Sequence, residues 1–78
     1  MSNANMNMQK SFKEQDREHI LTYIKKEEGD VKVDDIITNS GAHKLRVYPI
    51  LFELVQEKIL KVVKNDEMGA PMVVRMVV

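Results

Sequence analysis

The stretch from Val33 to Val78, VDDIITNSGAHKLRVYPILFELVQEKILKVVKNDEMGAPMVVRMVV, has the pattern of helix, tight turn, helix, strand, glycine-containing loop and strand. Ile37 is followed by Gly41 four residues later and by Val47 ten residues later. This is the spacing at which two helices joined by a short turn share one small core. Gly41 suits the turn because glycine takes a positive φ at no steric cost. The stretch therefore predicts a helix-turn-helix followed by two strands.

The longer predicted helix starts at Ala42 or His43 and continues to about Glu57. Its apolar residues form two neighbouring rows, which predict a broad buried face. The rows are Val47, Leu51 and Leu54, and Leu45, Tyr48, Phe52 and Val55. Pro49 lies inside this helix, where a proline removes one backbone bond and normally costs about 3 kcal/mol. We expect a continuous helix that bends there. The alternative is a helix that starts near Val47 and has Pro49 in its first turn.

Two antiparallel strands are predicted after this helix. Residues 59–63 alternate apolar and basic side chains, and residues 72–78 are rich in β-branched side chains. The connection over residues 64–71 is too long for a tight hairpin and contains Asn, Asp, Gly and Pro, which are typical of a projecting loop. The last strand has few polar residues, so its edge or outer face needs a cover. A second copy of the chain is the simplest cover.

One more helix and a short strand are predicted upstream. Ser11 and Glu14 have the spacing of a capping box, so a helix should begin near Phe12, and Gly29 is placed to end it. Residues 31–33 alternate and are expected to add one edge rung to the sheet. The predicted fold class is therefore α+β: a three-helix winged helix-turn-helix with a small antiparallel β-sheet, whose projecting loop is the wing.

The N-terminal ten residues are set apart from this domain. They are rich in Asn and Met without periodicity, and Ser2-Asn3-Ala4 resembles residues left by an expression vector. We expect residues 1–10 to be a disordered or tag-derived tail and residues 11–78 to form the winged-helix domain.

The composition argues against several classes of protein. There is no cysteine, so neither a disulfide nor a thiolate metal site is possible, and the two histidines show no ligand spacing with carboxylates. No apolar run approaches the roughly 20 residues that cross a bilayer, and the N-terminus lacks the apolar core of a signal peptide. We therefore expect a cytoplasmic protein without a membrane segment, a metal or another cofactor.

Catalysis has little support in the sequence. His19 and His43 have no nucleophile at a motif spacing, and the paired carboxylates are adjacent in sequence, so their side chains diverge. The three glycines are isolated and form no phosphate-binding loop. We expect a binding protein rather than an enzyme.

Charge is distributed unevenly along the chain. Twelve basic and twelve acidic side chains give a formal net charge of zero, which counts against indiscriminate binding of polyanions. Residues 12–40 contain five basic and eight acidic side chains, whereas residues 41–64 contain five basic and two acidic ones. The positive surplus falls on the longer helix and the first strand after it, where a winged helix contacts nucleic acid. A chance imbalance is the alternative.

The run Val47-Tyr48-Pro49-Ile50-Leu51-Phe52-Glu53-Leu54, followed by Ile59-Leu60, resembles the recognition helix and first wing strand of PadR-like transcriptional regulators. The hallmark of that family is Leu-Tyr-Pro-x-Leu-x-Arg-Leu-Glu before Gly-Leu-Ile. Tyr48, Pro49, Leu51 and Leu54 match it, whereas Glu53 stands where the family has arginine. The resemblance implies a winged helix that binds DNA. It does not include the C-terminal helix through which these regulators usually dimerise.

Six residues are candidate contacts to duplex DNA. They are His43, Lys44, Arg46 and Tyr48 on the longer helix, and Lys61 and Lys64 on the strand after it. The N-terminal part of a recognition helix enters the major groove, where an arginine can contact guanine in a bidentate manner. Lysines on the wing would contact phosphates. The alternative is that the helix residues are ordinary solvated side chains and that the tyrosine belongs to the core.

The leading hypothesis is a small winged-helix DNA-binding protein, a transcriptional regulator that acts as a homodimer. The alternative is a winged helix that binds another protein, with its last strand and its acidic wing tip, Asp66 and Glu67, against the partner chain. Zero net charge favours the protein partner, and the placement of the basic residues favours double-stranded DNA.

Overall fold

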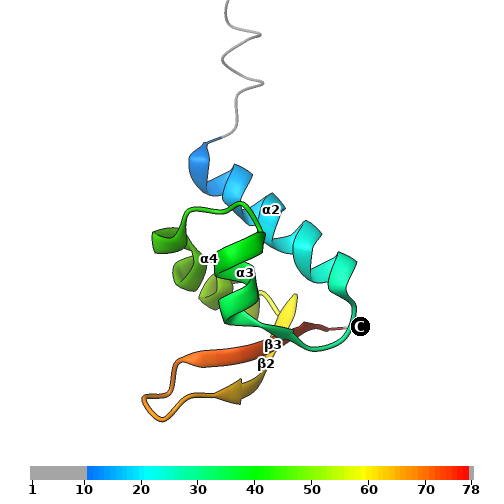
Figure 1. Cartoon of the computed structure of the whole chain (residues 1–78), viewed down its shortest axis with the longest axis vertical. Helices are drawn as coiled ribbons and strands as arrows, with labels where there is room; N and C mark the ends of the chain where they lie inside the picture. The colour runs from blue at the N-terminus through cyan, green and yellow to red at the C-terminus, as the bar shows by residue number, and fades with distance from the viewer. Residues whose placement is uncertain (1–10, 78) are drawn as a thin grey trace, which may run out of the picture.

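The computed structural model describes residues 11–77, in which three helices and three strands follow one another. Their order is α2 (Phe12–Glu27), β1 (Val31–Lys32), α3 (Val33–Asn39), α4 (Lys44–Gln56), β2 (Leu60–Asn65) and β3 (Pro71–Met76). The helices pack together and the β2–β3 hairpin projects from them (Figure 1). This layout confirms the predicted α+β winged helix-turn-helix. The prediction for residues 1–10 lies outside the described residues.

Local signals set the two ends of α2 as expected. Ser11 and Glu14 form a complete capping box, in which the serine side chain accepts from the Glu14 N–H at 3.1 Å and the glutamate accepts from the Ser11 N–H at 3.0 Å. After the helix ends, Glu28 and Gly29 both have a positive φ, at 53° and 78°. The chain thereby turns back toward the sheet, where β1 begins two residues later.

One apolar core joins all six elements. Ten large side chains are less than 2 % exposed, and together they hold the three helices against the inner face of the sheet. They are Ile20, Ile24, Val33, Ile36, Val47, Ile50, Leu51, Leu54, Leu60 and Val74. Ile37, expected to face the core from α3, is half-buried against this cluster.

The buried face of α4 is narrower than predicted and is rotated on the helix. Leu45 and Phe52, assigned to a buried row, are 74 % and 52 % exposed, whereas Ile50 is 1 % exposed. At 3.6 residues per turn, Ile50 falls beside Val47 and Leu51, while Leu45 and Phe52 fall on the opposite side. Of the second apolar row, Leu45 and Phe52 therefore lie outside the core, whereas Tyr48 and Val55 pack against it.

Pro49 lies inside a continuous α4, as expected, and the alternative start near Val47 is wrong. The helix begins at Lys44, and the His43 side chain caps it by accepting from the Leu45 N–H at 3.1 Å. The bond that Pro49 cannot donate would go to the carbonyl of Leu45, a residue on the exposed side of the helix. Water can take that place.

The sheet has the strand order β1-β3-β2, so β3 is its central strand. Val31 and Lys32 of β1 pair antiparallel with Val74 and Val73. The one-rung edge strand is thus confirmed, although Val33, predicted to extend it, is the first residue of α3. β1 and β2 pair with the two edges of β3. Along these pairs the last strand has no free edge, so a second copy of the chain is not needed to cover it.

The loop of the wing spans residues 66–70 and is shorter than predicted, because β2 continues to Asn65 and Asn65 pairs with Pro71. The Asp66 carboxylate accepts from the N–H groups of Met68 and Ala70, both at 2.8 Å. Asp66 therefore orders the tip of the hairpin from within. Its charge serves the turn itself, which is a structural reason for an acidic residue at this position.

Replacing Gly41 with alanine is expected to lower the free energy of unfolding by about 1–2 kcal/mol, because an L-residue is strained in the left-handed region. Gly41 has a φ of +88°, and an added Cβ would meet only the His19 Nδ1, at an ordinary 3.6 Å. The loss should thus come from the backbone and not from a clash. Urea unfolding measures it, with Gly41→Asn as the matched control, which should lose less. Equal losses in the two variants would contradict this assignment.

Candidate nucleic-acid interface

The N-terminal turn of α4 presents two of the predicted contact residues to solvent. His43 and Lys44 are exposed, at the point where the helix-turn-helix turn ends and α4 starts. His43 uses its Nδ1 to cap the helix, which leaves its Nε2 available. Lys44 lies one turn before Tyr48 on the same side of the helix. In helix-turn-helix proteins that bind DNA, residues at this position of the second helix approach DNA first.

Three ion pairs connect α2 with α4 and with Glu57, the residue that follows it, and they neutralise three of the basic residues. The Arg17 guanidinium donates to both carboxylate oxygens of Glu57, at 3.2 and 2.7 Å. The other pairs are Lys13 with Glu53 and Arg46 with Asp16, both at 2.5 Å. The α2–α4 contact is therefore a row of alternating charges with little net positive field.

Arg46, predicted to contact DNA, is half-exposed and donates to Asp16 of α2. Its Nε donates to the Asp16 carboxylate, and its guanidinium carbon lies 5.8 Å from the centre of the Phe12 ring. The side chain keeps 40 % of its surface exposed. Arg46 is thus bound to Asp16 while part of its side chain is still exposed to solvent.

Asp16 is the one buried charged residue among residues 11–77, at 7 % exposure. Burial disfavours its charged form, but the bonds donated by Arg46 and by the backbone N–H of His43 outweigh burial and hold the pKa of Asp16 below its ordinary 3.8. The Asp16 carboxylate thus connects α2 to His43, the residue before α4, and to Arg46 in the first turn of α4.

The Asp16 carboxylate should make protein stability depend on pH. Its pKa is lower in the folded than in the unfolded protein, so its contribution is complete above about pH 3.8 and is lost as pH falls through the lower, folded value. We expect Asp16→Asn to cost about 2 kcal/mol at pH 7, the value of hydrogen bonds to a charged group. Urea unfolding at several pH values should show this difference shrinking in acid. Glu67→Gln at the exposed wing tip is the control, expected to change little at any pH.

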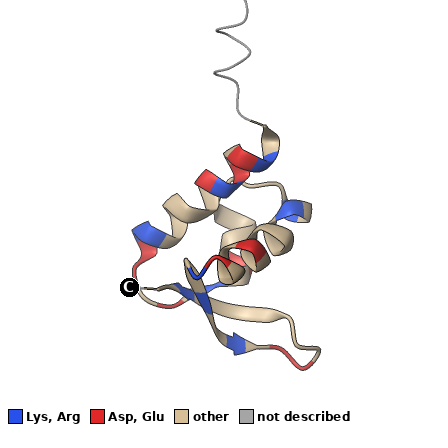
Figure 2. Cartoon of the chain, turned by 180° about the vertical axis from the view of Figure 1, so that it is seen from behind, with Lys and Arg blue, Asp and Glu red and all other residues tan. Residues whose placement is uncertain are grey.

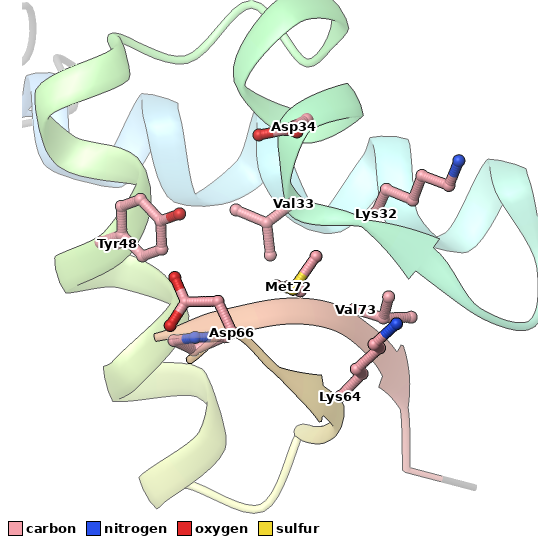
Figure 3. A pocket seen from close by; sticks show the side chains of 9 residues that line it. Lys32, Val33, Asp34, Tyr48, Lys64, Asp66, Met72 and Val73 are labelled. Atoms are coloured by element: carbon pink, nitrogen blue, oxygen red, sulfur yellow. The ribbon is translucent and has the colours of Figure 1, made fainter. Parts of the chain in front are cut away.

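A groove of about 470 Å³ lies between α4 and the wing, and it brings two of the predicted contacts together. Half-buried Tyr48 forms one end, and the amines of Lys32 and Lys64 lie at the other, with Val33 and Met72 between them (Figure 3). Asp34 and Asp66 add two negative charges to the lining. The groove is therefore mixed in charge, and its two lysines lie at the end away from Tyr48.

Lys61 is exposed on β2, directly opposite Arg75 of β3. Residues opposite each other in an antiparallel pair project to the same face, so both basic side chains lie together on the sheet. Arg75 also pairs with Asp30 at 3.5 Å. Figure 2 shows basic residues along the projecting hairpin and acidic residues at its tip.

Three functional candidates were missed by the sequence analysis. Asp16 gives no local signal, because its partner Arg46 is 30 residues away. Lys32 could have been found, since it alternates with two buried valines and must therefore point outward. Arg75 belongs to the predicted last strand, and only its pairing with β2 places it beside Lys61.

Three apolar residues lie on the exposed side of α4. Leu45, Pro49 and Phe52 are spaced four and three residues apart and are all exposed. Side chains at this spacing lie on one face of a helix. The face between Lys44 on one side and Arg46 on the other is thus suited to contact an apolar surface, whether base methyl groups or another protein.

Comparison with known protein families, with curated proteins and with solved structures finds no match to this chain. The resemblance to PadR-like regulators therefore stays a prediction. Among residues 11–77, no helix is long and apolar enough to cross a bilayer. The same residues include no group of three His, Asp or Glu side chains placed to hold a metal ion.

Proposed function

We propose that this protein binds duplex DNA, with α4 in the major groove and the wing on the phosphate backbone. The observation that carries the proposal is the division of its basic residues. At the α2–α4 contact, Lys13, Arg17 and Arg46 are paired with carboxylates. Lys25, Lys26 and Lys58 make no ion pair within residues 11–77, and neither do the four lysines that lie together at the start of α4 and on the sheet, Lys32, Lys44, Lys61 and Lys64. These four lysines are all exposed. They belong to the α4 N-terminus and to the sheet, where a winged helix meets DNA.

Zero net charge does not oppose this proposal, because binding depends on the local field. Phosphate contacts act over about a Debye length, which is ~8 Å at physiological salt. The carboxylates of Asp16, Glu53 and Glu57 already have partners at the contact between α2 and α4. The exposed Leu45 and Phe52 would then face the groove, where apolar side chains contact thymine methyl groups.

As part of this proposal, the protein acts in the cytoplasm as a homodimeric transcriptional regulator. Two recognition helices related by a two-fold axis read half-sites about 34 Å apart, which gives a small domain enough contact area for one operator. The edge strand β2 is the surface through which two copies could meet. Light scattering at increasing concentration tests this part: a mass that never exceeds one chain would refute the dimer.

The second candidate function is docking of a protein partner, and it is favoured by the same exposed side of α4. Leu45 at 74 % and Phe52 at 52 % exposure are large apolar side chains in contact with solvent. An exposed apolar helix face is a common protein-binding surface. In this case α4 would bind a partner helix or groove, and the lysines would only keep the surface soluble.

Fluorescence anisotropy with a labelled 20-base-pair duplex of random sequence separates the two functions. Four phosphate contacts predict a slope of about −3.6 for log K against log salt, or a roughly 100-fold loss of affinity between 50 and 200 mM salt. Absence of binding at 50 mM salt, where electrostatic attraction is strongest, would reject DNA as the ligand. An affinity that does not change with salt would also contradict the proposed phosphate contacts.

A further inference from the structure

Arg46 is fixed more tightly than the other exposed basic residues of α4. Its Nε donates to Asp16, which is itself 93 % buried and cannot move without disturbing the core side of α2. The Phe12 ring lies 5.8 Å from the guanidinium carbon, within the range of a cation–π contact. Two groups of α2 therefore contact this guanidinium and restrain its position.

The restrained guanidinium still has an open end. An arginine carries five N–H donors, and one of them is used at Nε. The two Nη atoms form a planar fork, and 40 % of the side chain is exposed. A fork of this kind matches the O6 and N7 acceptors of guanine in the major groove. Arg46 is the third residue of α4, within the turn that contacts base edges in a helix-turn-helix.

The Asp16–Arg46 pair carries no net charge, which separates it from the free lysines. A neutral pair releases few counterions when it approaches phosphate, so it adds little to non-specific affinity. Its hydrogen-bonding geometry is nevertheless retained. A neutral and rigid fork can distinguish one base from another while contributing almost nothing to attraction for DNA in general.

We propose that Asp16 is a positioning residue that holds Arg46 as a preoriented, charge-neutralised fork for one guanine in the major groove. This inference rests on the proposed function, since it needs α4 to enter DNA. It assigns the two tasks of binding to different residues: the unpaired lysines attract any duplex, and the Asp16–Arg46 pair selects among sequences. The same carboxylate that holds Arg46 also accepts from the N–H of His43 at the start of α4. Asp16 therefore contributes both to the choice of DNA sequence and to the stability of the fold.

The experiment compares three full-length proteins on two duplexes. A preferred duplex is first enriched from a random-sequence library with the wild-type protein, and its affinity is measured beside that of a random duplex by anisotropy at several salt concentrations. Arg46→Lys keeps a positive charge beside Asp16 but has no fork. We expect it to lower the ratio of the two affinities roughly tenfold, while the random duplex is bound with unchanged affinity and salt slope.

Asp16→Asn gives the distinctive second result. It removes the restraint on Arg46 and one negative charge, so the affinity ratio should again fall roughly tenfold while binding to the random duplex becomes stronger. A purely structural role predicts the opposite: Asp16→Asn would weaken binding to both duplexes by the same factor, and Arg46→Lys would keep the full ratio. Circular dichroism at the assay temperature confirms that each variant is folded.

The failures of the two proposals can be told apart. If the wild-type protein binds the random duplex with the expected salt slope but enriches no sequence, or if the variants keep the wild-type ratio, the role of Asp16 and Arg46 is overturned and DNA binding stands. If the wild-type protein binds no duplex at low salt, both proposals are overturned. The proposed role of Asp16 and Arg46 is supported if Arg46→Lys lowers the ratio of the affinities for the preferred and the random duplex and Asp16→Asn binds the random duplex more strongly.

Discussion

Replacing Leu51 with alanine is expected to lower the free energy of unfolding by about 2–5 kcal/mol. Leu51 is fully buried, at 0 % exposure, in the middle of α4. Removing three of its carbon atoms loses the transfer free energy of a buried side chain and leaves a cavity that this small domain can close only in part. Domains of this size have small stability margins, so the variant is expected to be substantially unfolded at 37 °C.

Leu45→Ala is the matched control on the same helix. It removes the same atoms from a side chain that is 74 % exposed, so its effect on unfolding should stay within about 0.5 kcal/mol. Urea unfolding followed by circular dichroism measures both variants. Similar losses for Leu45→Ala and Leu51→Ala would mean that the second apolar row of α4 is buried after all, and the observed orientation of this helix would be wrong.

The double substitution Lys44→Ala with Lys64→Ala is expected to weaken binding to a random duplex roughly 100-fold at 50 mM salt, since each phosphate contact contributes about tenfold there. The two lysines lie on α4 and on the wing, and neither makes an ion pair within residues 11–77. Loss of two contacts should also reduce the slope of log K against log salt by about 1.8. Anisotropy titrations over 50–200 mM salt give both values.

Lys25→Ala with Lys26→Ala is the control for that experiment. It removes the same two charges from the last turn of α2, where both side chains are exposed. The overall charge of the two double variants is identical, so any difference between them reports where DNA binds. Equal weakening in both would show that attraction depends only on net charge, which would contradict an interface on α4 and the wing.

Local signals explain why the element order could be predicted from the sequence. The capping box at Ser11 and Glu14, the positive φ of Gly41 and the turn residues of the wing act over a few neighbouring residues. Such patterns are visible in a linear reading. The strand order is different, because it depends on which edge of β3 accepts β1, more than 40 residues away in the chain. No local pattern specifies that choice.

The site was predicted less completely than the fold, and Arg46 shows why. A basic residue on the first turn of a helix is easily identified from the sequence, but its buried partner Asp16 lies 30 residues earlier on another helix. Leu45 and Phe52 show the same limit for apolar residues. Periodicity identifies two rows on α4, whereas the packing of α2 and the sheet decides which row is covered.

The most direct test of the proposed interface is a set of ¹H–¹⁵N correlation spectra of the labelled protein during addition of a random-sequence duplex at 50 mM salt. We expect the largest shifts at the backbone amides of residues 43–46 in α4 and of residues 61–64 in β2, with little change at residues 25–28. Addition of 200 mM salt should reverse most of these shifts. Unchanged spectra, or shifts confined to α2, would contradict a DNA interface formed by α4 and the wing.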